Sequence, residues 1–268
     1  GEGGWAMGYS DPGAGSDLAS LSCRAELNGD HYVINGRKVW TSDAMDCDYI
    51  FILARTDPDA PQHLGISLIL VDMHQVGVQV SPIRLLSGAS PFNETVFENA
   101  LASADDVIGG VNNGWTVGKR LLQFERSTHA GINTSGSQGG RTSDSTLPMQ
   151  LQPYLSGQPA LRRALVGHQM DFAAQRLTQQ RVIEETAANA PGFASSAVKL
   201  SNALITQAGD ELLINALGTQ GVGWAGDFTA TELTATRTWL KQKSLTIAGG
   251  TMEVQKNIIA KRVLGLPD

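Results

Sequence analysis

The spacing of apolar residues changes once along the chain, near residue 108, and this change limits the folds that the chain can adopt. Between Leu21 and about Phe97, short runs of apolar and β-branched residues alternate with turn residues, which is typical of β-strands. After residue 108, most segments carry apolar residues at helical spacing. We therefore expect an α+β chain of two domains, an antiparallel β-barrel-like domain over residues 1–107 and an antiparallel four-helix bundle over residues 108–268.

Turn residues divide the first domain into expected strands. Asn28-Gly29-Asp30 predicts a turn between two alternating segments, and Asn35-Gly36 predicts a second turn. Further strands are expected over residues 49–55, 65–73, 76–83 and 94–99. Because turn-rich spacers separate these runs, we expect the strands to pair as an antiparallel meander.

The second domain is expected to begin with a helix near Trp115. Residues 131–157 are rich in glycine, serine, threonine and proline, and predict a long mobile connection between helices. Two long helices are expected next, from Pro159 to about Asn189 and from Ala197 to Leu217. Their expected inward residues are Leu161, Leu165, Phe172 and Ala173 on the first, and Leu200, Leu204, Ala208 and Leu212 on the second. A final helix is expected over Thr251–Val263, with Thr251 as its cap.

The charge of the chain argues against a nucleic-acid ligand. The formal net charge is −6 at pH 7, whereas nucleic-acid binding normally requires a concentrated basic surface. The longest strongly apolar run, Gly65–Val71, is well short of the roughly 20 residues that cross a bilayer. The acidic, glycine-rich beginning does not resemble a signal peptide. We therefore expect a soluble cytoplasmic protein without membrane insertion.

Neither metal chemistry nor a nucleophilic serine is indicated by the sequence. The five histidines form no ligand pair such as HExxH, so no metal is expected. Ser16 lies in GAGSD rather than in the GxSxG pattern of a nucleophile elbow. Cys23 and Cys47 are too few for a disulfide framework and lack the spacing of a zinc site, so both are expected to be reduced structural thiols.

Residues 8–20, GYSDPGAGSDLAS, form a loop rich in glycine and serine. The loop lacks the Gly-Lys-Ser/Thr ending of a P-loop and the GxGxxG spacing of a dinucleotide-binding loop. Its glycines allow the backbone to approach a ligand closely, and its serines offer hydroxyl groups. By itself the loop is compatible with a plain turn, an anion cradle or part of a larger site.

Four distant segments together resemble the acyl-CoA dehydrogenase family. They are GYSDPGAGSD at residues 8–17, GRKVWTSDA at 36–44, LLQFERS at 121–127 and IAGGTMEVQKNIIAKRVLGLP at 247–267. The resemblance covers nearly the whole chain, in the order of the family's middle β-domain and C-terminal helical domain. The family's N-terminal helical domain is not in this sequence, which is expected to be a fragment, a proteolysed form or a chain that relies on a partner.

The resemblance implies FAD as the cofactor and an acyl-CoA thioester as the substrate. It places near the flavin the residues Tyr9, Ser10, Trp40, Thr41 and Ser42. It places near the adenine end, or in a turn close to the cofactor, the residues Asn215, Gly218, Gly221 and Thr251. It places near the acyl-CoA the residues Ser16, Arg126, Gly249 and Gly250. From the residues alone, a solvated glycine-rich hairpin and an indole that only fills a core are the alternatives for the loop and for Trp40.

The adenine end departs from the family pattern, because no Arg-x-x-Phe-Gly segment follows the first long helix. Many members use that segment to bind the diphosphate of a neighbouring subunit's FAD. Arg141, Arg162 and Arg163 are candidate substitutes, but arginines with this spacing also occur on bundle surfaces for solubility.

The catalytic base departs from the commonest family pattern. In many members a glutamate directly precedes the Gly-Thr of the C-terminal motif, and Gly249 stands at that position here. Other members, including the isovaleryl type, carry the base on the helix after the β-domain, next to an arginine. Glu125 beside Arg126 matches this second arrangement, so the resemblance implies Glu125 as the base. From the residues alone, a solvated helical Glu-Arg pair is the alternative.

The expected function is FAD-dependent α,β-dehydrogenation of an acyl-CoA to a trans-2-enoyl-CoA, with electrons passed to an electron-transfer flavoprotein. An acyl-CoA oxidase and a noncatalytic or partly catalytic subunit of a heteromeric dehydrogenase are the alternatives. The helices are expected to assemble the chain into a homo- or hetero-oligomer, a tetramer built as a dimer of dimers. The absence of a side chain at Gly249 predicts room for a bulky acyl group, while the sequence does not fix chain length, branching or steroid character.

Overall fold

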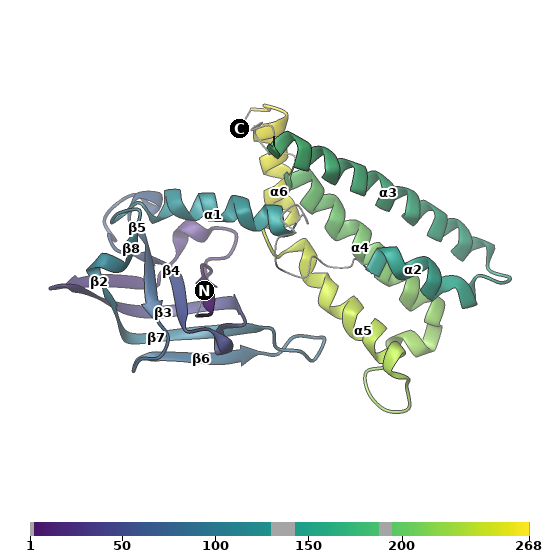
Figure 1. Ribbon diagram of the computed structural model, residues 1–268, viewed down its shortest axis with the longest axis horizontal. Coiled ribbons are helices and arrows are strands. Elements are labelled where there is room, and N and C mark those ends of the chain that lie inside the picture. The colour runs from purple at the N-terminus through teal and green to yellow at the C-terminus, as the bar shows by residue number, and fades with distance from the viewer. Residues whose placement is uncertain (1–2, 130–142, 188–194, 268) are drawn as a thin grey trace. The chain divides into compact units, whose positions relative to one another are not determined.

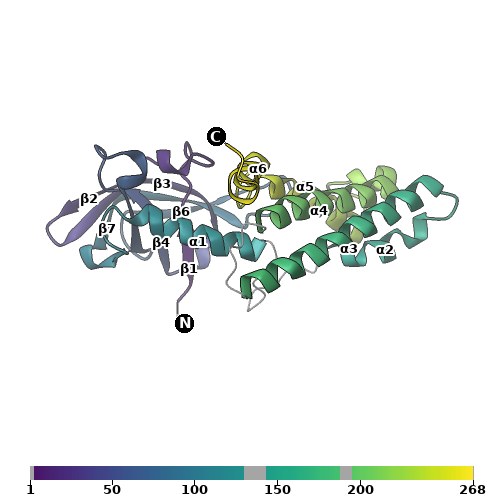
Figure 2. The ribbon, with the colours of Figure 1, turned by 90° about the horizontal axis from the view of Figure 1, so that it is seen from above.

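The computed structural model describes residues 3–129, 143–187 and 195–267 of the chain. It divides into two compact units, Gly1–Leu122 and Gln123–Asp268, each of which is described by itself. Helix α1 (Gly114–His129) begins in the first unit, because side chains of its N-terminal half pack against an apolar cluster there. Figure 2 shows this half of α1 beside β4 (Tyr49–Arg55), which contributes Leu53 to that cluster.

The first unit is built on an eight-stranded sheet (Figure 1). The strand order is β6-β7-β3-β2-β4-β5-β8, with β1 paired to β4. Most pairings are antiparallel, and the pairings of β4 with β1 and with β2 are parallel. Besides β4, the strands are β1 (Trp5–Gly8), β2 (Arg24–Asn28), β3 (His31–Ser42), β5 (Ile66–Asp72), β6 (Val78–Ile83), β7 (Phe92–Ser103) and β8 (Val107–Ile108).

The core of the sheet is built from the alternating apolar residues of its strands. Along each strand every second side chain points to the same face, so apolar residues two apart enter the core together. Ile50 and Ile52 on β4 and Ile34 on β3 are fully buried in one cluster with Phe97 of β7. The predicted strands over residues 49–55, 65–73, 76–83 and 94–99 correspond to β4, β5, β6 and the middle of β7.

The turn predicted at Asn35-Gly36 is wrong, because β3 runs without interruption through both residues. The register there shifts from Ile34 opposite Ala100 to Gly36 opposite Phe97, so β7 carries one extra residue. The Asn35 side chain bonds to Asn99 of β7 at this bulge. Its Oδ1 accepts the Asn99 N–H at 2.9 Å, and its Nδ2 donates to Asn99 Oδ1 at 3.2 Å. Gly36 lies so close to Cys23 that a Cβ would stand 2.6 Å from the Cys23 Cα.

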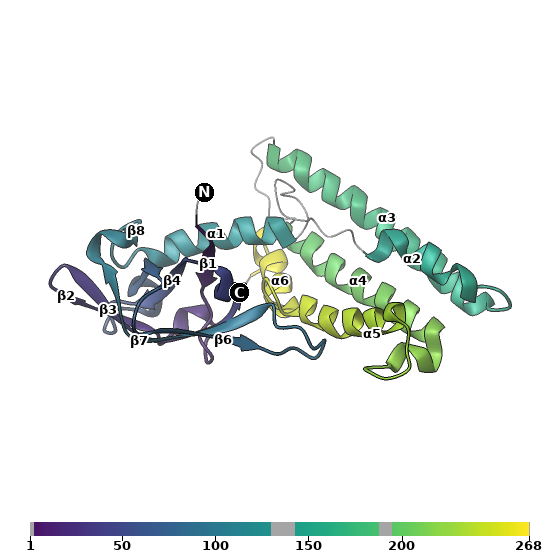
Figure 3. The ribbon, with the colours of Figure 1, turned by 60° about the horizontal axis from the view of Figure 1, so that its bottom comes forward.

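The second unit is helical, and α4 (Ser195–Leu217) contacts each of the other helices. Figures 1 and 3 show α4 between α3 and α5. The other helices are α2 (Ser143–Leu151), α3 (Pro159–Ala187), α5 (Ala230–Gln242) and α6 (Met252–Ile258), which continues as a π-helical turn over Ile259–Val263. The α+β architecture expected from the sequence is therefore present.

Helix α2 corrects the prediction of a mobile connection over residues 131–157. Residues 131–142 lie outside the described part of the chain, but Ser143–Leu151 are helical despite Pro148. Leu147 and Leu151, four residues apart, are buried and pack with Leu165 of α3 in one apolar cluster. Burial of this small apolar face outweighs the turn-forming composition of the segment, because tertiary packing routinely overrides local propensity.

The inward faces of the long helices were predicted only in part. Leu165 is buried as expected, but Ala173 on α3 and Leu204 and Ala208 on α4 are exposed. The buried face of α4 instead carries small and polar residues, including Ser196, Lys199, Ala203, Thr206 and Asp210. An apolar pattern cannot find a face that is partly polar. Helix α5 was also not predicted, although Thr229 and Glu232 form a complete capping box at its start.

Three further observations bear on the chemistry of the described residues. None of the described helices is long and apolar enough to span a membrane. No group of three or more histidine, cysteine, aspartate or glutamate side chains that could hold a metal is found among them. Both cysteines are free thiols.

Candidate functional site

The opening loop lies between β1 and β2, and its predicted site residues differ in exposure. The Tyr9 ring is buried and packs edge-to-face on Phe51, with centroids 6.1 Å apart. Ser10 is half-buried, and its carbonyl oxygen accepts the Val39 N–H at 2.9 Å. Ser16 is exposed and follows Ala14, which pairs with Asp11 in an isolated β-bridge. The loop therefore meets β3 through its backbone at Ser10.

The pairing of β3 with β7 contains a second bulge, this time on β3, and it carries the WTS segment, residues 40–42. Lys38 pairs with Thr95 and Thr41 with Asn93, so three steps on β3 match two on β7. Trp40 in this bulge has φ 64°, a left-handed conformation that is strained for a bulky residue. Its side chain is 58% exposed, so the alternative that Trp40 fills a core is wrong for this unit. Bulges commonly re-aim a side chain in this way next to functional sites.

The residues after Trp40 provide hydroxyl groups at two depths. Ser42 is exposed, whereas Thr41 is fully buried. The Thr41 Oγ1 has no hydrogen-bond partner among the described residues. A buried hydroxyl without a partner is uncommon, so this is a position where an ordered water or a ligand atom would complete the hydrogen bonding.

A buried ion pair joins the loop to the bulge. Lys38 Nζ lies 2.6 Å from Asp11 Oδ1 and donates a second hydrogen bond to the Tyr9 carbonyl oxygen at 3.0 Å. The Lys38 side chain has no exposed surface and that of Asp11 has 2%. The other Asp11 oxygen accepts the backbone N–H groups of Ser22 at 2.6 Å and Cys23 at 2.7 Å. Burial, which Asp11 reinforces and Lys38 opposes, raises the pKa of the Cys23 thiol to about 11, so this thiol is unreactive.

Sequence reasoning missed this ion pair, although β3 carries a signal for it. Tyr32, Ile34 and Lys38 share the same parity along the strand, and the first two point into the core. A lysine in the inward register of a strand must find a buried anion, since an unpaired buried charge is strongly unfavourable. Asp11, at position 4 of the opening motif, is that anion.

The predicted turn at Gly249–Thr251 is a glycine turn in the second unit. Gly249 has φ 66° and Gly250 has φ 94°, conformations that favour glycine. Thr251 caps α6 as predicted, because its side chain accepts the Val254 N–H at 3.3 Å. Two buried side chains hold the turn from below: Lys199 Nζ donates to the Gly250 carbonyl oxygen at 2.6 Å and Gln255 Nε2 donates to the Gly249 carbonyl oxygen at 2.8 Å.

The predicted adenine-side residues lie at the opposite end of α4 from this turn. Asn215 is exposed near the C-terminus of α4, and Lys199, which contacts the glycine turn, lies 16 residues earlier. At about 1.5 Å per residue the two positions are about 24 Å apart along the helix. Gly218 is exposed with φ 58°, whereas Gly221 is buried, where a Cβ would stand 2.6 Å from the Ile214 carbonyl oxygen. Packing alone therefore requires glycine at residue 221.

The predicted base and its neighbour have positions in α1, but their side chains lie outside the described part of the chain. Glu125 and Arg126 follow the half of α1 that packs on the first unit. Their contacts, and the distance of Glu125 from any other predicted site residue, are not defined. Arg141, a candidate anion partner, also lies outside the described residues.

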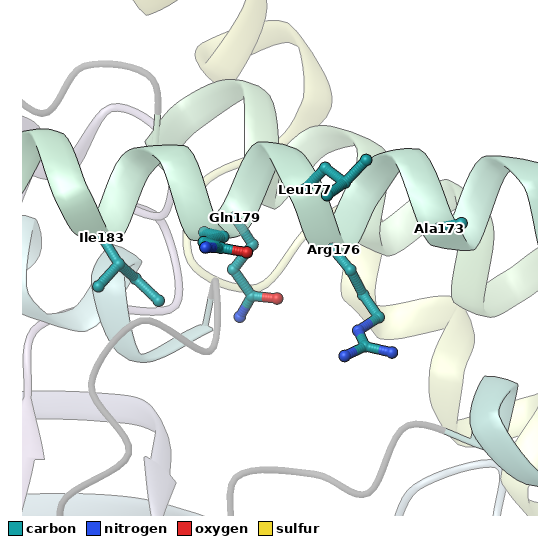
Figure 4. Close-up of a pocket in the computed structure, with 6 residues that line it drawn as sticks. Ala173, Arg176, Leu177, Gln179 and Ile183 are labelled. Atoms are coloured by element: carbon teal, nitrogen blue, oxygen red, sulfur yellow. The ribbon is translucent and has the colours of Figure 1, made fainter.

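A separate cavity of about 560 Å³ lies along α3 and holds none of the predicted site residues (Figure 4). Among the described residues that line it, Arg176 alone is charged, and it points away from the helix in the close-up. The remaining lining residues are apolar or amide side chains: Ala173, Leu177, Gln179, Gln180 and Ile183. None of these described lining residues is a candidate base or nucleophile, so we do not assign the chemistry to the cavity.

Comparisons with known proteins agree with the order of the two units along the chain. Residues 6–100 match the family model for the acyl-CoA dehydrogenase middle domain, and residues 112–264 match that for the acyl-CoA dehydrogenase C-terminal domain. The chain belongs to the acyl-CoA dehydrogenase family. This family of oxidoreductases is generally FAD-dependent.

Two relatives from Mycobacterium tuberculosis are similar to nearly the whole chain. Acyl-CoA dehydrogenase IpdE1 of Mycobacterium tuberculosis is 38% identical over 266 residues, which are 98% of this chain and 67% of that protein. Acyl-CoA dehydrogenase FadE34 of the same organism is 35% identical over 98% of this chain and 35% of its own length. Among solved structures, the Tcur3481-Tcur3483 steroid ACAD has a TM-score of 0.87 at 30% identity, over 98% of this chain and 68% of that one.

A second solved structure is a complex of two different chains. The ChsE4-ChsE5 complex from Mycobacterium tuberculosis has a TM-score of 0.76 at 26% identity, over 98% of this chain and 69% of the matched chain.

The described residues of the first unit fit a flavin in one specific respect. An exposed indole stands one residue from a buried hydroxyl that lacks a partner, and both lie in a bulge that the opening loop holds.

Proposed function

We propose that this chain carries out FAD-dependent α,β-dehydrogenation of an acyl-CoA thioester, which gives a trans-2-enoyl-CoA. The observation that carries the proposal is the β3 bulge, where Trp40 is 58% exposed and the neighbouring Thr41 Oγ1 is buried without a partner among the described residues. A flat heterocycle with polar edges complements this pair, because the indole offers a face and the hydroxyl a hydrogen bond. Membership of a generally FAD-dependent family supports the same cofactor.

In this proposal the first unit holds the flavin ring and the acyl end of the substrate. Trp40 packs against the ring, while Thr41 and Ser42 contact its polar edge. The backbone of Tyr9 and Ser10 approaches the same edge, since the Tyr9 ring is buried. Ser16 is exposed and free to contact the acyl-CoA. FAD, when bound, supplies the acceptor for the hydride that leaves the β-carbon.

The second unit contributes the remaining proposed contacts. Asn215 and Gly218 are exposed and are proposed on the adenine side, together with the backbone of Gly221. Gly249, Gly250 and Thr251 are proposed beside the substrate and cofactor. The carbonyl groups of both glycines accept hydrogen bonds from Lys199 and Gln255, so the turn is fixed without using its N–H groups.

Glu125 is the proposed base, because the glycine turn supplies no carboxylate at residue 249. Its carboxylate accepts the proton from the α-carbon while the β-carbon loses a hydride, so one proton and one hydride leave and the carbon–carbon double bond forms. Arg126 is proposed to orient the carboxylate or the substrate. Donors near the thioester oxygen would stabilise the negative charge that develops there.

The test of this function is Glu125→Gln in the chain purified with any partner that accompanies it. Gln keeps the size of Glu but cannot accept a proton, so substrate-driven bleaching of the flavin is expected to slow by about 10²–10⁴-fold while flavin remains bound. The matched control is Glu98→Gln, at an exposed position on β7, which should bleach at the parent rate. Anaerobic stopped-flow absorbance separates this half-reaction from the electron acceptor, and a parent rate in Glu125→Gln would disprove the role of Glu125.

An electron-transfer flavoprotein is the proposed acceptor of the electrons. The same reduced flavin in an oxidase would react with oxygen instead, so anaerobic dye reduction and peroxide production distinguish the two. We expect dye reduction without stoichiometric peroxide. Release of one peroxide per substrate turnover would assign the oxidase reaction to the chain.

The substrate is proposed to carry a bulky acyl group. Gly249 has no side chain where many family members carry glutamate, and the Tcur3481-Tcur3483 protein, a similar structure, is named a steroid ACAD. A screen of acyl-CoA thioesters should give higher kcat/KM for branched or polycyclic acyl groups than for short straight chains. The opposite order would refute the larger site.

Assembly into a tetramer through the helical unit is part of the proposal. Val166, Met170, Ala173 and Leu177 on α3 follow one another at spacings of four, three and four, so they share one face. Three of them are large and strongly exposed, at 55% for Val166, 67% for Met170 and 69% for Leu177. The helical unit of another chain, packed on this face of α3, would remove these apolar side chains from water. Light scattering at low concentration tests this, and a stable monomer would contradict it.

A noncatalytic subunit of a heteromeric dehydrogenase is the second candidate function. It is favoured by Gly249 at the usual base position and by the two-chain composition of the ChsE4-ChsE5 complex that the chain resembles. The ratio of flavin to chain in the purified assembly distinguishes the two functions. One flavin per copy of this chain, with bleaching that requires Glu125, supports catalysis by the chain itself.

A further inference from the structure

The buried ion pair between Asp11 and Lys38 has hydrogen-bond partners in three separate segments of the first unit. Lys38 belongs to β3, the Tyr9 carbonyl oxygen to the opening loop, and the N–H groups of Ser22 and Cys23 to the entrance of β2. The Ser22 hydroxyl adds a further bond to Asp11, at 3.2 Å. Each carboxylate oxygen therefore holds a different segment, one through Lys38 and one through residues 22 and 23.

Such a pair is a poor source of net stability, because burial removes both charges from water and the attraction between them only offsets that cost. Apolar side chains of similar volume often serve a core equally well. A buried pair can instead fix one arrangement of the chain, because any shift leaves a charge unpaired. Lys38 can do this for the site, since it is the last β3 residue in regular register before the bulge that carries Trp40 and Thr41.

The bulge has a second link to the same loop. Val39, between the ion pair and Trp40, donates its N–H to the Ser10 carbonyl oxygen at 2.9 Å. The loop is thus attached on both sides of Ser10, at the Tyr9 carbonyl and at the Asp11 carboxylate. Movement of Lys38 would therefore change both the loop and the conformation of the bulge.

We propose that Asp11 and Lys38 are positioning residues, which hold the opening loop against the β3 bulge and thereby set where Trp40 and Thr41 stand toward the flavin. The pair is not placed among the residues that touch flavin or substrate, because both side chains are buried and their polar atoms already bond to each other and to backbone groups. The part of the proposal that concerns the flavin rests on the proposed function. The effect of the pair on the conformation of the bulge does not depend on the proposed function, and it can be tested in the chain without flavin.

The test uses the double variant Asp11→Asn/Lys38→Met, which removes both charges together and leaves neither unpaired. Its control is Arg37→Met/Glu94→Gln, which removes an ion pair of 3.6 Å from the adjacent residue of β3, where both side chains are partly exposed. Thermal melting should show that both variants remain folded. Should the double variant not fold, Asp11→Asn/Lys38→Gln takes its place, since it also removes both charges and its two amide side chains can hydrogen-bond to each other and to the backbone.

The first readout is hydrogen exchange of the whole chain, measured by mass spectrometry without added flavin. The backbone amides of residues 36–42 should exchange at least about tenfold faster in the double variant, as expected for local opening that a shared anchor had suppressed. Peptides from β5 should exchange as in the parent. The control variant should match the parent in both segments.

The second readout is the rate of anaerobic flavin bleaching at saturating acyl-CoA. A misplacement of roughly 1 Å costs about 10²-fold in rate, so the double variant should lose kcat by that order with a smaller change in KM. Parent exchange at residues 36–42 would overturn the proposal, and so would faster exchange with an unchanged bleaching rate. Absence of flavin binding in the parent refutes the proposed function instead, and the exchange experiment still tests the positioning of the bulge.

Discussion

Gly36→Ala is expected to destabilise the first unit strongly, because two independent features of the backbone exclude a side chain there. The φ of Gly36 is 147°, where residues with a Cβ are rarely found. An added Cβ would also lie 2.6 Å from the Cys23 Cα and 2.8 Å from the Cys23 Cβ. The nearest obstacle is backbone, so no change of rotamer relieves it.

The size of the effect follows from these two contributions. Backbone strain of this kind costs of order 1–3 kcal/mol, and overpacking a core costs about 1–3 kcal/mol. The free energy of unfolding should therefore fall by about 2–6 kcal/mol. For a unit of this size, about 4 °C is lost per kcal/mol, so the melting midpoint should drop by roughly 10 °C or more.

Differential scanning calorimetry measures this drop, and two other glycines separate its causes. Gly13→Ala meets no atom within 4 Å and has no positive φ, so it should melt with the parent. Gly29→Ala has a φ of 67° but also meets no atom within 4 Å, so it reports the conformational cost alone. If Gly36→Ala melts together with Gly29→Ala, the close approach of Cys23 is not the cause. If it melts with Gly13→Ala, both arguments fail.

Three further predictions concern α2 and the buried thiol. Leu147→Ala should lower the free energy of unfolding of the second unit by about 2–5 kcal/mol in urea titrations, whereas the exposed Met149→Ala on the same helix should have little effect. At pH 8 a thiol reagent should modify Cys47 and spare Cys23, because Cys47 is partly exposed whereas Cys23 is fully buried with a pKa raised by burial to about 11. Burial and the nearby Asp43, Asp46 and Asp48 also raise the pKa of Cys47, so its reaction should be slow but measurable. Because the pKa of Cys23 lies above the ordinary 9.0, the contribution of Cys23 to stability is present below pH 9 and lost as the pH rises toward 11, and Cys23→Ala should remove this part of the decline.

The opening loop and the WTS segment could be located from the sequence, but their geometry could not. Glycine content and motif order identified both segments. The exposure of Trp40 depends on the bulge, which exists only when β3 pairs with β7, a strand more than 50 residues away in sequence. Whether Glu125 faces this site stays a prediction, because its side chain lies outside the described residues.

The sequence by itself located most of the strands and helices, because alternation and helical spacing are local properties of the chain; β1, β8 and the continuity of β3 through Gly36 were not predicted. The pattern over Tyr49–Arg55 gave β4 to the residue, and Thr251 was found as a cap from its place before an apolar helix. These features need no distant partner to be recognised. They also fixed the order of the two units.

Only the tertiary structure decided which polar groups are buried and what they hold. The charge of Lys38 is compatible with the core because Asp11, 27 residues earlier in the sequence, lies within 2.6 Å of it. The charge of Lys199 is compatible with the buried face of α4 because its Nζ donates a hydrogen bond to the carbonyl oxygen of Gly250, 51 residues later in the sequence. The cost of burying a charge is offset by partners that neighbouring residues do not reveal, which is why residue patterns located the elements of the fold and missed the polar contacts that shape the site.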